Sequence, residues 1–147
     1  MKAGSVKQQK GAVALEFAAV FVIFFAVFYG VVSYGLPMLM LQSFNQASSE
    51  AVRRCVALDP SSKTYRNDVD TLAKGVLGEQ LAWMPKSLNF QLASDASVTL
   101  TAGNLLTVKI DYAKEKLSAV LPVLILPGIG EVPRLPTHLT AAASLQL

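Results

Sequence analysis

Glu16 has the most unusual setting of any ionisable residue, because it is a single acid at the start of a long apolar run. From Phe17 to Leu41 the only ionisable side chains are those of Tyr29 and Tyr34. The hydrocarbon core of a bilayer is about 30 Å thick, and a helix crosses it with about 20 apolar residues. The run is therefore long enough to span a membrane, and an acid at one end of it requires a partner or a function.

The other residues that could do chemistry form no recognisable catalytic or metal-binding pattern. The chain has one cysteine, Cys55, and one histidine, His138, which argues against a thiol–imidazole pair. Asp68 and Asp70 are two positions apart in an expected helix, so they point to different faces. The two glycines of residues 128–130 lack the lysine of a phosphate-binding loop. We therefore expect no enzymatic activity, no metal site and no cofactor.

The lone cysteine cannot form a disulfide within the chain. Cys55 lies on the same expected helix face as Ala47 and Ala51, so we expect a small buried hydrophobic side chain there. The alternative is an exposed thiol that cross-links to another chain.

Three lysines, at positions 2, 7 and 10, precede Gly11 and account for the whole net charge of +3. Cationic flanks stay in the cytoplasm, so we expect a cytoplasmic N-terminus and a C-terminal domain beyond the membrane. No basic stripe with interleaved aromatic residues follows, which argues against nucleic-acid binding. The apolar run is about twice as long as the core of a cleaved secretory signal, and no Ala-x-Ala site follows it. The segment should therefore remain in the product.

Two helices are expected. The first runs from Ala12 to about Leu58 and is apolar all round in its first half, then amphipathic. Pro37 should kink this helix or locally melt a turn, because it removes a backbone hydrogen bond. The second runs from near Thr64 to Trp83. We expect Ser62 or Thr64 to cap it, Val69, Leu72 and Val76 to form its buried stripe, and Pro85 to close it.

After residue 85 the apolar period changes to two, which predicts antiparallel strands with one buried face at residues 88–92, 98–100, 106–112 and 139–145. Residues 117–138 are apolar but contain four prolines, which excludes a central strand. This segment is expected either as a loop folded back on the sheet or as an exposed apolar lobe that docks on a neighbouring subunit. The predicted fold class is α+β.

Residues 10–17, Lys-Gly-Ala-Val-Ala-Leu-Glu-Phe, combine a basic leader ending in glycine with four small or apolar residues, a glutamate and an aromatic residue. A glycine-aromatic segment follows at residues 28–35 and a polar continuation at residues 42–54. Over residues 8–58 the chain resembles the TadE-like minor pilins, or pseudopilins, of the Tad (tight adherence, type IVc) pilus system. Two positions depart from the usual pattern. Cys55 stands where the family commonly has arginine, and Phe17 stands where its short major pilins have tyrosine.

The resemblance implies that a membrane-embedded prepilin peptidase cuts between Gly11 and Ala12 on the cytoplasmic side. Its implied domain division is a leader at residues 1–11, a transmembrane helix at 12–41 and a periplasmic pilin-like domain at 42–147. The new ammonium of Ala12 could pair with Glu16 of a neighbouring subunit, with Phe17 beside it in the assembly helix. The alternative is that Glu16 is favoured only by the dipole at the start of its helix.

The resemblance thus implies a non-enzymatic minor pilin of the inner membrane, incorporated in or at the tip of a pilus that supports surface adhesion. Its partners would be the prepilin peptidase, other pilins and the pilus assembly machinery. One alternative is an uncleaved, signal-anchored periplasmic binding module that recruits a partner through residues 117–138. Another is a type II secretion pseudopilin, although such proteins more typically have phenylalanine directly after the cut.

Overall fold

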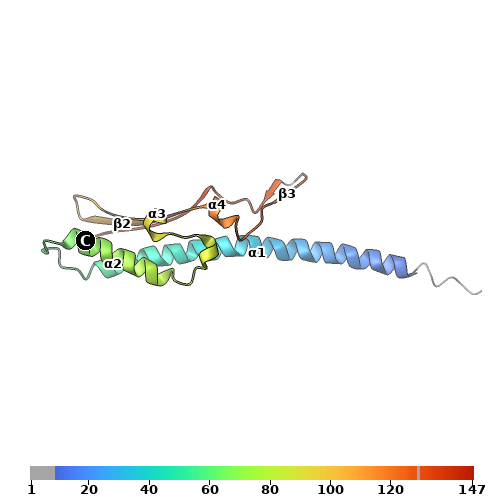
Figure 1. Cartoon of the computed structure of the whole chain (residues 1–147), viewed down its shortest axis with the longest axis horizontal. Coiled ribbons are helices and arrows are strands. Elements are labelled where there is room, and N and C mark those ends of the chain that lie inside the picture. Colours follow the sequence, from blue (N-terminus) through green and yellow to red (C-terminus); the bar gives the residue numbers. More distant parts are fainter. Residues whose placement is uncertain (1–8, 129) are drawn as a thin grey trace, which may run out of the picture.

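The structure is a computed structural model that describes residues 9–128 and 130–147; most of the expected basic leader lies outside these residues. One long helix carries a small α+β domain on its C-terminal half (Figure 1). The predicted α+β class is confirmed. The elements are α1 (Gln9–Cys55), α2 (Tyr65–Gln80), η1 (Lys86–Leu88), α3 (Leu92–Asp95), β1 (Ala96–Leu100), β2 (Leu105–Ala113), α4 (Lys114–Leu117), β3 (Leu124–Leu126), β4 (Gly130–Val132) and β5 (His138–Gln146).

The helix α1 confirms the expected long helix and continues through Pro37 without a break. The prediction of a locally melted turn at Pro37 is therefore wrong. A kink at that position stays a prediction. Pro37 is fully buried, as are Ser33 and Met40, because the domain begins to cover α1 in this region. Cover by a neighbouring element stabilises a helix that has lost one backbone hydrogen bond, since packing rather than propensity supplies most helix stability.

The helix α2 runs back along the C-terminal half of α1, as Figure 1 shows. It begins close to the expected residue but ends at Gln80, before the expected Trp83. Thr64 occupies the cap position without a side-chain bond to the backbone, so the expected side-chain cap is wrong. Its hydroxyl instead donates to the carboxylate of Asp68 at 2.8 Å, which removes it from the helix amides.

The sheet has three antiparallel strands in the order β1-β2-β5. These strands confirm the alternation predicted at residues 98–100, 106–112 and 139–145. The strand predicted at 88–92 is wrong, because short helical turns form there instead. Asn89 adopts a left-handed backbone with φ of 49°, and the Asp95 carboxylate accepts the Gln91 amide at 2.9 Å. Such side-chain bonds to the local backbone compete with strand pairing.

The core lies between one face of the sheet and the two long helices. Every second residue of β2 is buried: Leu106, Val108, Ile110 and Tyr112. The facing stripe on α1 consists of Phe44, Ala47, Ala51 and Cys55, as the amphipathic pattern predicts. Fully burying each large apolar side chain stabilises the fold by about 1.5–3 kcal/mol, so this contact holds the domain on the helix.

The proline-containing segment 117–138 divides between the two alternatives: Leu117 and Leu121 are buried in the core, whereas the middle of the segment does not fold back on the sheet. It forms a two-stranded hairpin, β3–β4, which extends from the domain along α1 toward the N-terminal end of that helix (Figure 1). Ile125, in β3, is 79% exposed. The hairpin part of the segment is therefore the exposed apolar lobe, and its docking on a neighbouring subunit stays a prediction.

Candidate functional site

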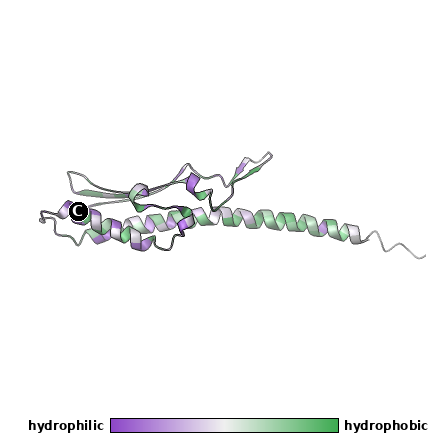
Figure 2. Ribbon diagram, in the orientation of Figure 1, coloured by the Kyte–Doolittle hydropathy of each residue, from purple (hydrophilic) through white to green (hydrophobic). Residues whose placement is uncertain are grey.

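The N-terminal part of α1 carries no domain cover. From Gly11 to Phe28 every residue is exposed, and Figure 2 shows this part of the helix as almost continuously hydrophobic. Phe17, Phe21 and Phe25 stack one turn apart, with ring centroids 6.2 Å from one to the next. A helix that is apolar all round must be covered by lipid or by other helices. By length and composition α1 is sufficient to cross a membrane.

The four residues expected at the processing and assembly site all lie in the first turns of this bare helix. A Cβ built on Gly11 would meet no side chain of the described residues within 4 Å, so this glycine lies on an open face of the helix. Ala12 and Glu16 are four residues apart and therefore share one face, about one turn from each other. Among the side chains that the structure describes, none forms an ion pair with Glu16.

Two tyrosines join the domain to α1 well before residue 42, the expected start of the domain. The Tyr29 hydroxyl donates to the Pro122 carbonyl and lies 3.5 Å from the Val132 carbonyl. The Tyr34 hydroxyl accepts the Arg134 amide at 3.0 Å. In the sequence, both tyrosines stand out as ionisable residues within the apolar run and as members of the glycine-aromatic segment 28–35. The available signal was that a tyrosine in such a helix needs a hydrogen-bond partner for its hydroxyl.

The soluble end of α1 carries ordinary surface electrostatics. Arg54 donates to Glu50 at 2.9 Å, and this hydrogen bond holds the pKa of the Glu50 carboxyl below its usual value. Arg54 also lies 3.4 Å from Glu79 of α2. All three side chains are at least partly exposed, and such pairs contribute little to stability.

The residues first considered for chemistry have separate structural partners. Cys55 is fully buried, and its thiol lies 3.7 Å from the Val69 carbonyl. Burial raises the pKa of this thiol, which confirms a small hydrophobic side chain rather than an exposed reactive one. His138 contacts Asp111 at 2.6 Å on the surface. Within the described ranges, no group of three potential metal ligands occurs.

The two helix acids also have different neighbours. Asp68 accepts the Thr64 hydroxyl, and Asp70 pairs with Lys74 at 2.8 Å, so they do not form a dyad. Gly128 and Gly130 both have positive φ; Gly128 lies in the turn of the β3–β4 hairpin and Gly130 begins β4. Both glycines therefore serve the backbone of the hairpin, since glycine adopts a positive φ without strain.

The family model described as TadE-like protein matches residues 11–53. This segment is TadE-like. The match begins at Gly11, includes Glu16 and Phe17, and ends two residues before α1 does. The match confirms the resemblance for this segment of α1. No curated protein and no solved structure matches the chain.

The TadE-like match and the fold divide the chain differently. The family model covers the bare half of α1 and the half that the domain covers, but little of the domain itself. One long apolar helix at the N-terminal end fits a single-pass membrane anchor. All residues that the family model matches therefore belong to α1, and the domain lies outside the match.

Proposed function

We propose that this chain is a minor pilin, or pseudopilin, that takes part in assembly of a Tad-type pilus after processing by a prepilin peptidase. The observation that carries the proposal is the TadE-like part of α1, which is exposed from residue 11 to residue 28 and belongs to a helix long enough to span a membrane. A helix of this kind can pass from lipid to a bundle of similar helices without exposing apolar surface to water.

In the inserted state, the lysine-bearing leader lies in the cytoplasm and the domain lies in the periplasm, with α1 crossing the inner membrane. The proposed cut falls between Gly11 and Ala12. It removes three lysines and creates a new ammonium one helical turn from Glu16. We divide the chain accordingly into a leader at residues 1–11, a transmembrane helix at 12–41 and the pilin-like domain at 42–147. The Tyr29 and Tyr34 contacts lie in the second half of that helix, so the domain also touches α1 before residue 42.

During assembly, Glu16 of one subunit pairs with the Ala12 ammonium of a neighbour. Two opposite charges in a low-dielectric bundle satisfy each other, whereas either one alone is costly. The pair therefore fixes the axial register of adjacent helices more than it adds net stability. The neighbouring Phe17, Phe21 and Phe25 rings supply the apolar contact around the pair. Surface adhesion follows from incorporation of the domain into the pilus.

The test is incorporation of full-length variants into filaments sheared from the native host. Glu16→Gln keeps the side-chain shape and removes the charge, so we expect at least about a tenfold loss from the sheared fraction. Glu50→Gln makes the same change on the same helix at an exposed surface pair and serves as the matched control. Equal incorporation of Glu16→Gln and wild type, at equal amounts in the membrane, would overturn the assembly role.

An uncleaved anchor with a binding domain is the alternative that the exposed hairpin favours. Such an anchor needs no particular residue at position 11 and no charge at position 16. It therefore predicts that Gly11→Val and Glu16→Gln both leave the function of the protein unchanged.

A further inference from the structure

The β3–β4 hairpin lies beside the part of α1 that is long and apolar enough to span a membrane. Leu124 and Val132 pair directly in the hairpin and face α1. With the helix they enclose an open groove of about 280 Å³, lined also by Phe21, Val22, Phe25, Ala26 and Tyr29. Apart from the Tyr29 hydroxyl, every lining side chain is a hydrocarbon. The neighbouring pair, Ile125 and Glu131, points to the opposite face of the hairpin.

The length of the apolar run places this groove at membrane depth. A span of about 20 residues that begins after the charge of Glu16 ends near Leu36. A span that begins at Gly11 ends near Gly30 by the same count. In both cases Phe21 to Ala26 lie within the hydrocarbon layer, and these residues line the groove together with Leu124 and Val132 of the hairpin. The hairpin therefore cannot stay in bulk water while α1 spans the bilayer.

We propose that the β3–β4 hairpin is a second membrane contact, which inserts into the leaflet on the domain side and holds a phospholipid acyl chain in the groove. The Tyr29 hydroxyl binds the segment that leads into β3, and the Tyr34 hydroxyl binds the segment that follows β4. Tyrosine is enriched at the membrane–water interface, which sets these two residues at the headgroup level. Ile125 and Leu124 then lie below that level, among the acyl chains.

The charged residues around the hairpin suit a shallow position. Lys114 pairs with Glu131 at 3.1 Å, which neutralises the one acid of the hairpin. The guanidinium of Arg134 lies close to Gly130, at the start of β4. A two-stranded hairpin also has unpaired backbone groups along its edges, which need water or headgroups. The hairpin thus belongs at the boundary of headgroups and acyl chains, as amphipathic interfacial elements do.

A phospholipid is favoured over a protein partner because the groove continues directly into the bare surface of α1. Residues 11–28 must be covered by acyl chains whenever the helix spans the bilayer. The groove opens on that same surface and contains no unpaired charge that would select a peptide. The inference depends on membrane insertion of α1 and not on processing or on the pilus.

The test measures the depth of single labels on the full-length, uncleaved chain in vesicles of phosphatidylethanolamine and phosphatidylglycerol. In a Cys55→Ala background, an environment-sensitive fluorophore is attached to Ile125→Cys, to Phe24→Cys or to Val56→Cys. Phe24 calibrates a position on the bare helix, and Val56 is an exposed apolar residue at the far end of α1. Quenching is measured with phospholipids that carry a nitroxide near the headgroup end of the acyl chain, at a high lipid-to-protein ratio.

We expect the label at position 125 to be quenched at least about threefold more than the label at position 56. Its quenching should approach that of the label at position 24. Equal quenching at positions 125 and 56, with strong quenching at 24, would overturn the proposal. Quenching at 125 that disappears on dilution in lipid, with energy transfer between labelled chains, would assign the face to a second copy and also overturn it. Absence of quenching at 24 would remove its premise. None of these outcomes depends on peptidase processing, so the proposed pilus role is tested separately.

Discussion

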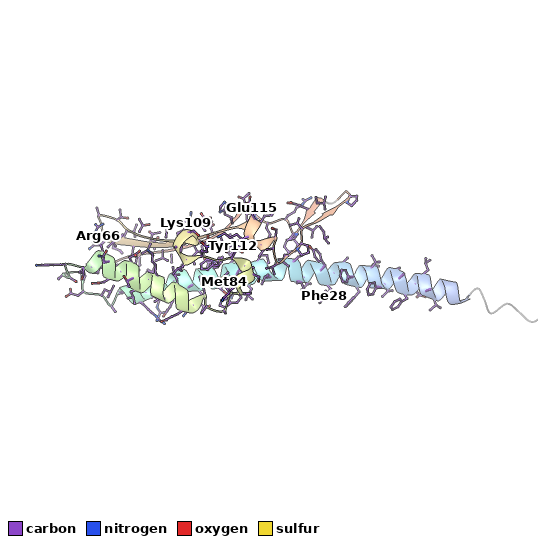
Figure 3. All side chains as sticks on the ribbon, in the orientation of Figure 1. Phe28, Arg66, Met84, Lys109, Tyr112 and Glu115 are labelled. Atoms are coloured by element: carbon purple, nitrogen blue, oxygen red, sulfur yellow. The ribbon has the colours of Figure 1, made fainter. Side chains whose placement is uncertain are left out.

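Two groups of aromatic rings lie along the same helix in opposite environments. Near the N-terminal end, Phe17, Phe21 and Phe25 stack with centroids 6.2 Å apart and are more than half exposed. Near the other end, Phe44 lies 5.7 Å from Phe90 and 6.0 Å from Tyr112 and is fully buried. Figure 3 places Phe28 on the bare part of α1 and Tyr112 where the sheet faces the helices.

The comparison teaches that ring spacing alone does not decide what an aromatic residue does. Among the described residues, the exposed rings stack only on other rings of α1, one turn away. The buried rings come from three elements distant in sequence, and together they fix the domain on the helix. One half of α1 therefore contributes to folding within the chain, whereas the other half has its contacts outside it.

The largest expected effect comes from truncating one ring in each group. Phe44→Ala should lower the free energy of unfolding of the domain by about 3–5 kcal/mol, because it leaves a cavity in the core. Phe24→Ala, on the bare half of the same helix, should change it by less than about 0.5 kcal/mol. Urea unfolding of the full-length protein in detergent, followed by the fluorescence of the single tryptophan Trp83, measures both. Similar losses of unfolding free energy in the two variants would show that the two halves of α1 do not differ in their contribution to folding.

A second prediction uses the hydroxyl of the buried ring. Burial, and after it the charge of Asp95, raises the pKa of Tyr112 from 10.0 to about 12. Its contribution to the free energy of unfolding is therefore present below pH 10 and is lost as pH rises toward 12, by up to about 3 kcal/mol. Tyr112→Phe should lack this alkaline loss, as measured by urea unfolding at several pH values.

At neutral pH the same Tyr112→Phe variant should be less stable by about 1–2 kcal/mol, because the Leu88 carbonyl loses a donor at 2.6 Å. The matched control is Tyr65→Phe, a substitution in α2 that leaves Tyr112 in place and should keep the alkaline loss of the wild type. An alkaline profile of Tyr112→Phe that matches the wild type would assign the loss to another group.

A third prediction concerns the boundary between the two halves. Tyr29→Phe removes the hydroxyl that binds the Pro122 carbonyl, at a cost of about 1 kcal/mol. Because this contact holds the hairpin and not the sheet, amide hydrogen exchange in β3 and β4 should accelerate about fivefold. Exchange in β2 should stay unchanged and is the internal control. Acceleration in β2 to the same extent would show that Tyr29 supports the whole domain.

The smallest effect is expected at the exposed ion pair of α1. Arg54 lowers the pKa of Glu50, so the contribution of this pair is present above the usual carboxyl pKa and is lost as pH falls through the lowered one. Solvent screens the pair, and Glu50→Gln should leave the urea midpoint at neutral pH within experimental error. A resolved loss that disappears in high salt would show that this surface pair matters more than its exposure indicates.

The sequence predicted those parts of the fold whose signal is local. Alternation revealed β2 and β5, and the apolar stripe revealed which face of α1 receives the domain. The strand expected at 88–92 failed because Asn89 and Asp95 direct the backbone into turns, which alternation does not register. The candidate residues Gly11, Ala12, Glu16 and Phe17 came from a family pattern within one helix. The hairpin beside Tyr29 could not be predicted, because it depends on a contact between residues about a hundred positions apart.

The central claim is that the bare half of α1 is a processed assembly helix. The most direct measurement is the intact mass and N-terminal sequence of the protein purified from the membranes of its own host, with Gly11→Val as the control. The account predicts that the wild-type protein begins at Ala12 and that the variant keeps its leader. A wild-type protein that begins at Met1, in cells whose prepilin peptidase processes another substrate, would contradict it.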